Sequence, residues 1–254
     1  MPDFIRVSSA GPVRTITLAR PEARNALNYK MLAEMLEAFQ IEPPADERVT
    51  ILRGDGPAFC AGMDLKERLA DPPPGNESPI ETMLASIEAY PLPVVAIVHG
   101  DAIAGGNELA LHCDFVIASS KASFGMSLAQ IGLAPTWFLL KKLMEVAGPV
   151  ATREVLLLGD PLPSTRMYEL GVISRVAPPH ALEATAKAVI DRLAANAPLS
   201  LRAMKGSIVR QLQYRSQIEH ADTDALVDAA RKSSDSIEGV SAKVERRQPN
   251  FTGS

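Results

Sequence analysis

The segment that most limits the possible folds is PVVAIVHG, a nearly unbroken apolar run from Pro93 to Gly100. A strand that is apolar on both faces needs cover on both faces, as in parallel sheets packed between helices. Gly105 and Gly106 follow it, then helical spacing to about His112, and then a second apolar strand, DFVIAS. This repeated order of strand, turn and helix predicts an α/β fold with a largely parallel sheet.

The rest of the N-terminal half fits the same class of fold. FIRV and VRTITLA flank a Gly-Pro turn and predict a hairpin. The proline-rich residues 71–77 predict a loop, after which Ser78 and Glu81 form a capping box for a further helix. Three more elements are expected from periodicity: a helix over residues 31–39, a strand over 48–54 and a helix from about residue 64.

The C-terminal part of the chain has a different pattern. From Pro178 onward the sequence predicts helices, and we expect no strand after residues 172–176. We therefore expect two regions, with residues 1–195 forming the α/β core that carries the binding site. Residues 196–254 would form a helical region that makes oligomer contacts.

The composition argues against several classes of function. A net charge of -4 and a pI near 5.7 argue against nucleic acid, whose backbone is bound by clustered Lys and Arg. Residues 122–140 carry no charge, but glycines and polar residues interrupt them, which predicts an irregular pocket wall rather than a membrane span. Cys60 and Cys113 show no disulfide or metal-binding spacing, and the N-terminal residues lack a signal-peptide pattern. We therefore expect a cytoplasmic protein without a bound metal.

Two strand-to-helix turns carry glycines, at Gly62 and at Gly105. The first residues of a helix have no intrahelical acceptor for their N–H groups, and the helix dipole adds positive charge there. Two such N–H groups aimed at one point form an oxyanion hole, worth about 3 kcal/mol per donor in the transition state. Tight chain geometry alone also explains glycines at such turns. Glu108 is then either a helix acid favoured by the dipole or a catalytic group.

Five segments carry a resemblance to a known family: RPEARNALN, FCAGMDL, GDAIAGGNELALHCDFVIAS, ASFGMSLAQIGLAP and ERRQPNFTGS. Together they resemble the crotonase family of enoyl-CoA hydratases, isomerases and relatives, over essentially the whole chain. The resemblance implies a spiral of ββα units with a C-terminal helical trimerisation region, often in a dimer of trimers. It also implies an acyl-CoA thioester as substrate, with no cofactor beyond the coenzyme A moiety.

The resemblance also implies roles for particular residues. The thioester oxygen would lie between the N–H groups of Met63 and Gly105, which stabilise an enolate, with Glu108 as catalytic acid and base. Phe251 looks like the family's terminal aromatic residue that approaches the adenine. Coenzyme A would lie along Arg24, Ala26, Leu27, Ala61, Asp64 and Leu65. Positive charge for its phosphates would come from Arg20, Arg24, Lys66 and Arg68.

One position departs from the family's pattern. Typical hydratases that resemble this chain use a second glutamate shortly after the Phe-Gly pair, where this sequence has Leu128. An aliphatic side chain cannot transfer a proton, and Thr136, near where some relatives carry an aspartate, is not acidic. We expect an enoyl-CoA hydratase acting through Glu108, with isomerisation or methylmalonyl-CoA-type decarboxylation as alternatives. A non-catalytic acyl-CoA-binding protein is the remaining alternative.

Overall fold

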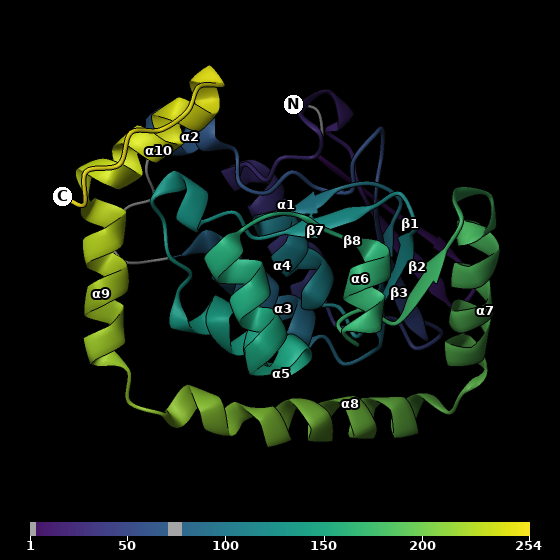
Figure 1. Ribbon diagram of the computed structural model, residues 1–254. Helices are drawn as coiled ribbons and strands as arrows, with labels where there is room; N and C mark the ends of the chain where they lie inside the picture. Colours follow the sequence, from purple (N-terminus) through teal and green to yellow (C-terminus); the bar gives the residue numbers. More distant parts are fainter. Residues whose placement is uncertain (1–3, 71–77) are drawn as a thin grey trace.

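The computed structural model of the protein describes residues 4–70 and 78–254, and its framework is a main sheet with a smaller sheet beside it (Figure 1). The six strands of the main sheet have the order β1-β2-β3-β4-β6-β9. β1 (Ile5–Ala10) and β2 (Val13–Leu18) form an antiparallel hairpin, and the other strands add in parallel. These are β3 (Val49–Gly54), β4 (Val94–Val98), β6 (Phe115–Ser119) and β9 (Arg175–Ala177). The predicted hairpin and the largely parallel sheet are confirmed.

Helices and a smaller sheet surround this main sheet. The smaller sheet consists of β5 (Ala102–Ile103), β7 (Ser123–Gly125) and β8 (Leu162–Pro163). The first helices are α1 (Tyr29–Gln40), α2 (Leu65–Ala70), α3 (Pro79–Ala89), α4 (Gly105–Leu111), α5 (Trp137–Arg153) and α6 (Ser164–Glu169). The later ones are α7 (Leu182–Ala195), α8 (Pro198–Leu212), α9 (Ala221–Lys232) and α10 (Ser234–Glu245).

Strand β4 shows why the apolar run is continuous. Val94, Ala96 and Val98 belong to the main core, together with buried side chains of α1, α3 and α4. Val95 and Ile97 belong to a second cluster, which α7 covers from the opposite face. Both faces of the strand are therefore buried, as expected for a sheet between layers of helices.

The last three helices lie around the core rather than in it. Figure 1 shows α8 running beneath the core, and α9 and α10 continuing along the side opposite α7. α10 packs against the turn at Ala129–Ile131, where a Cβ atom on Gly239 would lie 2.4 Å from the carbonyl carbon of Ile131. The helical C-terminal region is thus confirmed, while the division into domains at residue 195 stays a prediction. In the described ranges, no helix combines the length and apolar character that a bilayer crossing requires.

Two details near α3 differ from, or lie beyond, what the sequence predicts. The predicted loop at residues 71–77 lies outside the described residues. Ser78 precedes α3, but its side chain makes no capping hydrogen bond. The predicted capping box is therefore wrong, and the Glu81 carboxylate instead accepts a hydrogen bond from Thr136 at the start of α5.

Candidate active site

Two strand-to-helix turns meet at the edge of the main core. The N–H of Cys60 donates to the carbonyl of Asp101 at 3.1 Å, and the N–H of Ile103 donates to the carbonyl of Cys60 at 3.0 Å. Gly62 has a φ of +90°, and a Cβ atom there would lie 2.7 Å from the Ile103 oxygen. A Cβ atom on Gly106 would lie 2.1 Å from the Cys60 oxygen. These two glycines are therefore needed for the close approach of the turns, so tight geometry explains part of the glycine pattern.

Where the turns meet, two backbone N–H groups have no acceptor among the described residues. Leu27 pairs with Met63, but the Leu27 N–H and carbonyl bond to Gly62 and Asp64, so the Met63 N–H points away from that strand. Gly105 is the first residue of α4, and its nitrogen lies 3.1 Å from the position of a Cβ atom on Gly62. Within the described part of the chain, neither the Met63 nor the Gly105 N–H has a hydrogen-bond acceptor.

The residue before Gly105 holds an unusual backbone conformation. Ala104 has a φ of 49° and a ψ of -116°, in the half of conformational space that L residues avoid. Its N–H donates to the Gly125 carbonyl at 2.7 Å, and its own carbonyl accepts from the backbone N–H of Glu108 at 3.0 Å. Such a conformation costs about 1–3 kcal/mol and persists only where surrounding contacts enforce it. These hydrogen bonds fix the direction of the following Gly105 N–H.

The carboxyl of Glu108 projects from α4 into a cavity and has no hydrogen-bond partner among the described residues. Its side chain is 1 % exposed, and burial raises the pKa of this carboxyl to about 8, against the opposing effect of Lys142. The Nδ1 atom of His112 lies 3.8 Å from Glu108 Oε2, but it makes a 2.8 Å hydrogen bond to the Glu108 backbone carbonyl. Burial lowers the pKa of His112 to about 3, so the ring is neutral and offers no charge to the carboxyl.

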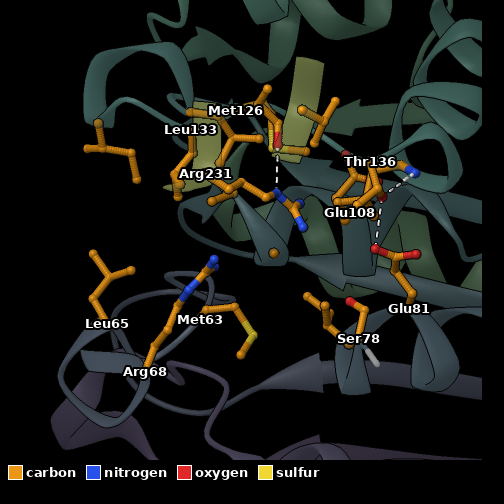
Figure 2. A pocket seen from close by; sticks show the side chains of 18 of the residues that line it. Met63, Leu65, Arg68, Ser78, Glu81, Glu108, Met126, Leu133, Thr136 and Arg231 are labelled. Atoms are coloured by element: carbon orange, nitrogen blue, oxygen red, sulfur yellow. Dashed lines mark hydrogen bonds between the residues drawn. The ribbon is translucent and has the colours of Figure 1, made fainter. Parts of the chain in front are cut away.

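The cavity has a volume of about 540 Å³ and is lined by the two turns, by α4 and by the C-terminal helices α9 and α10. Met63, Gly105 and Glu108 all line it, so the three predicted catalytic residues come together. Figure 2 shows several of the lining side chains, including Met63, Glu81 and Glu108. Much of the remaining wall comes from the predicted uncharged segment: Met126, Ser127, Leu128, Ile131, Leu133, Ala134, Thr136 and Leu139.

A second carboxylate, which the sequence did not indicate as a site residue, reaches this cavity from α3. Glu81 lies in the first turn of α3 and accepts a 2.8 Å hydrogen bond from the Thr136 hydroxyl (Figure 2). Its negative charge contributes to the raised pKa of Glu108, although burial contributes more. Thr136 stands at the start of α5, where it also caps that helix through the Leu139 N–H. Leu128 lines the same cavity with an apolar side chain.

The six residues assigned to coenzyme A lie on two adjoining segments. The Ala61 N–H donates to the Arg24 carbonyl at 3.0 Å, and the Leu27 N–H donates to the Gly62 carbonyl at 2.7 Å. Ala61 and Leu65 line the cavity, whereas the Leu27 side chain is fully buried in the core. Backbone pairing therefore places residues 24–27 beside residues 61–64 at the cavity rim.

Several charged residues near this rim are engaged in holding the fold. Asp64 lies 2.8 Å from Arg20, and its Oδ1 accepts from the Lys66 N–H at 3.1 Å at the start of α2. Burial opposes ionisation of Asp64, but the hydrogen bond and charge of Arg20 and the hydrogen bonds from the Glu67 and Lys66 N–H groups together outweigh it and lower the pKa. Arg20 also donates to the Ala26 carbonyl, and Arg24 pairs with Asp101 at 2.7 Å. Of the four predicted phosphate-binding cations, Arg20 and Arg24 thus already have carboxylate partners.

Phe251 lies apart from the cavity. It is 42 % exposed and is not one of the residues that line the cavity. The chain on either side of it is fastened to α10, because the Asn250 N–H donates to Glu238 at 2.9 Å and the Thr252 N–H donates to Asp235 at 2.7 Å. Within this single chain, the structure does not bring Phe251 together with the other predicted site residues.

The two cysteines and His99 have structural positions outside the catalytic group. Cys60 and Cys113 are buried thiols, and burial raises the pKa of Cys60 to about 12. His99 Nε2 makes a 2.8 Å hydrogen bond to the Gly56 carbonyl. Across residues 4–70 and 78–254, no three His, Cys, Asp or Glu side chains gather as metal ligands would.

Comparison with known proteins gives the family of this chain. The model of the family described as enoyl-CoA hydratase/isomerase matches residues 9–254. An enoyl-CoA isomerase/hydratase of Mycosarcoma maydis is 33% identical, over 94% of this chain and 92% of that protein. The 1,2-epoxyphenylacetyl-CoA isomerase of Escherichia coli is also 33% identical, over 100% of both chains.

Solved structures share the fold. A methylmalonyl-CoA decarboxylase superposes with a TM-score of 0.90 at 23% identity, over 99% of this chain and 98% of that one. An enoyl-CoA hydratase/carnithine racemase from Magnetospirillum magneticum superposes with a TM-score of 0.78 at 32% identity, over 100% and 97% of the two chains. The chain therefore belongs to the enoyl-CoA hydratase/isomerase family and has the crotonase fold.

Proposed function

We propose that this protein acts on acyl-CoA thioesters through an enolate. The observation that carries the proposal is the position of Glu108 in the first turn of the helix that begins at Gly105. Its buried carboxyl has no hydrogen-bond partner among the described residues. The Met63 and Gly105 N–H groups would bind the thioester oxygen as negative charge develops on it. Fixed donors of this kind contribute about 3 kcal/mol each to a transition state.

Hydration of an enoyl-CoA is the reaction that we propose first. Glu81, oriented by Thr136, supplies the carboxylate that is missing at Leu128. One proton of the attacking water would pass to Glu81 while its oxygen bonds to the β-carbon. Glu108, which is protonated below about pH 8, would then give its proton to the α-carbon of the enolate.

Double-bond migration or decarboxylation remains the second candidate. The apolar side chain of Leu128 favours it, because neither reaction needs a second proton-transfer group at that wall of the cavity. In isomerisation, Glu108 alone would remove a proton from the α-carbon and return it to the γ-carbon. In decarboxylation, the enolate would form by loss of carbon dioxide and would then be protonated.

A panel of thioesters read by mass spectrometry distinguishes these reactions. With crotonyl-CoA we expect a product heavier by one water, and Glu108→Gln should abolish it. Conversion of a 3-enoyl-CoA to a 2-enoyl-CoA without hydration would select isomerisation, and loss of carbon dioxide from a malonyl-type thioester would select decarboxylation. Binding of coenzyme A without turnover of any thioester would show a non-catalytic binding protein.

We also propose that the protein is a homotrimer or a dimer of trimers, acts in the cytoplasm and needs no cofactor beyond the coenzyme A moiety. Support for assembly comes from apolar side chains that α8, α9 and α10 expose to solvent. They are Met204, Ile208, Leu226 and Ile237, each more than half exposed. Light scattering of the purified chain tests the assembly, and a monomer at micromolar concentration would contradict it.

A further inference from the structure

Two guanidinium groups point into the cavity from opposite walls. Arg231 comes from α9 and Arg68 from α2, and Figure 2 shows both side chains directed toward the space beside Met63. The Nε atom of Arg231 donates to the Ala134 carbonyl at 3.3 Å, which fixes the plane of the guanidinium. Among the described residues, the terminal nitrogen atoms of Arg231 have no hydrogen-bond acceptor, which leaves them to a bound molecule.

Among the described residues, neither guanidinium has a carboxylate in ion-pair contact. In the part of the chain that the structure describes, no carboxylate oxygen lies within 4.0 Å of Arg68 or Arg231. Burial and the nearby charge of Arg68 both lower the pKa of Arg231, while Glu81 and Asp228 act on it in the opposite direction. The two like charges of Arg68 and Arg231 repel each other, so an anion bound by both would stabilise them.

Apart from Glu108, which burial keeps protonated at neutral pH, the acids that line the same cavity have other partners. Glu81 accepts the hydrogen bond from Thr136, and Asp228 pairs at 3.6 Å with Lys232, which also lines the cavity. Asp224 lies 2.7 Å from the Nδ1 atom of His220. In residues 4–70 and 78–254, the two guanidinium groups therefore face the cavity with no carboxylate in direct ion-pair contact.

The rest of this wall would suit an uncharged acyl chain. Met126, Leu128, Leu133 and Leu139 are apolar, so they alone would bind an aliphatic group. A partly buried arginine adds a desolvation cost that such a ligand would not repay. A planar guanidinium instead matches a carboxylate, with which it forms paired charge-assisted hydrogen bonds.

We propose that the acyl group of the substrate ends in a carboxylate, which Arg231 binds with the help of Arg68. This inference rests on the proposed acyl-CoA function and narrows its substrate to thioesters of dicarboxylic acids. Arg68 then serves the acyl end of the substrate, rather than the coenzyme A phosphates that the sequence resemblance suggests for it.

Calorimetric binding of saturated thioesters tests the proposal without requiring turnover. Three length-matched pairs differ only in a terminal carboxylate or methyl group: succinyl- and butyryl-CoA, glutaryl- and pentanoyl-CoA, and adipyl- and hexanoyl-CoA. We expect at least one dicarboxylic member to bind about tenfold or more tightly than its partner. Arg231→Met should remove that preference and leave the affinity for free coenzyme A unchanged.

Two further variants act as controls. Arg192→Met removes a charge from the exposed face of α7 and should keep the preference. Arg231→Lys keeps the charge without the planar donor pair, so it should retain only part of the preference if the geometry matters. Its thermal melt also shows whether position 231 tolerates substitution.

The contradicting results are distinct. Equal binding within every pair would overturn the dicarboxylate proposal while leaving acyl-CoA binding intact. Weaker binding of free coenzyme A by Arg231→Met would assign the guanidinium to a phosphate of the cofactor and would also overturn it. Failure to bind any acyl-CoA would contradict the proposed function as well.

Discussion

The Thr136 hydroxyl donates a 2.8 Å hydrogen bond to the Glu81 carboxylate, which joins the start of α5 to the first turn of α3 beside Glu108. If Glu81 is the base that activates water, Glu81→Gln should lower kcat for hydration of crotonyl-CoA by about 100-fold or more. Thr136→Val should lower it less, by about tenfold, because the carboxylate remains but loses its orientation. Thr136→Ser should restore activity. Hydration at the normal rate in Glu81→Gln would show that Glu81 plays no part in the chemistry.

The pH dependence of kcat/KM separates hydration from isomerisation. Burial raises the pKa of Glu108 to about 8, so the carboxyl is protonated at neutral pH. In hydration this proton is needed, and kcat/KM should fall as pH rises through about 8. In isomerisation the ionised form starts the reaction, and kcat/KM should rise over the same range. A profile that is flat from pH 6 to about pH 9 would contradict both roles for Glu108.

Glu108 should also reduce the stability of the folded chain at neutral pH. The unfolded state loses this proton near the ordinary value of 4.5, whereas the folded state holds it to about pH 8. The unfolded state therefore binds fewer protons between these values, and folding stability falls as pH rises. Glu108→Gln should increase the free energy of unfolding by about 3 kcal/mol at pH 7 and leave it nearly unchanged near pH 4. Urea titrations of both proteins at the two pH values measure this difference.

Alanine substitutions at two helical glycines should change the free energy of unfolding in opposite directions. A Cβ atom on Gly106 would lie 2.1 Å from the Cys60 oxygen, so Gly106→Ala should destabilise the fold by about 2 kcal/mol or more. Gly206 lies inside α8 with no heavy atom within 4 Å of a Cβ position, so Gly206→Ala should stabilise by up to about 1 kcal/mol. Thermal melts of the two variants should therefore shift in opposite directions. A neutral Gly106→Ala would mean that the turns do not need this contact.

The elements of the core were predictable because each carries its own local signal. The apolar run at residues 93–100 corresponds to β4, and its burial on both faces follows directly from its composition. The uncharged segment at residues 122–140 does form much of the cavity wall, as expected. The meeting of the Met63 and Gly105 turns followed from the family resemblance rather than from spacing, because their contact joins segments that are distant in sequence.

The residues that sequence reasoning missed act through long-range contacts. Glu81 satisfied the pattern of a capping box, and only the fold shows that it bonds to Thr136 instead. Arg231 lies in an amphipathic helix where a cation normally faces solvent, and the path of α9 alone brings it to the cavity. For Asp64, the helix-capping signal in the sequence was available and accounts for its hydrogen bonds.

The most direct test of the central claim is hydrogen exchange at the carbon atom beside the thioester. A 3-enoyl-CoA is incubated with the protein in deuterium oxide, and NMR follows the loss of the α-proton signal. The account predicts rapid exchange with the unaltered protein and with Glu81→Gln, and exchange at least about 100-fold slower with Glu108→Gln. Exchange at an unchanged rate in Glu108→Gln, or none with the unaltered protein, would contradict enolate formation through Glu108.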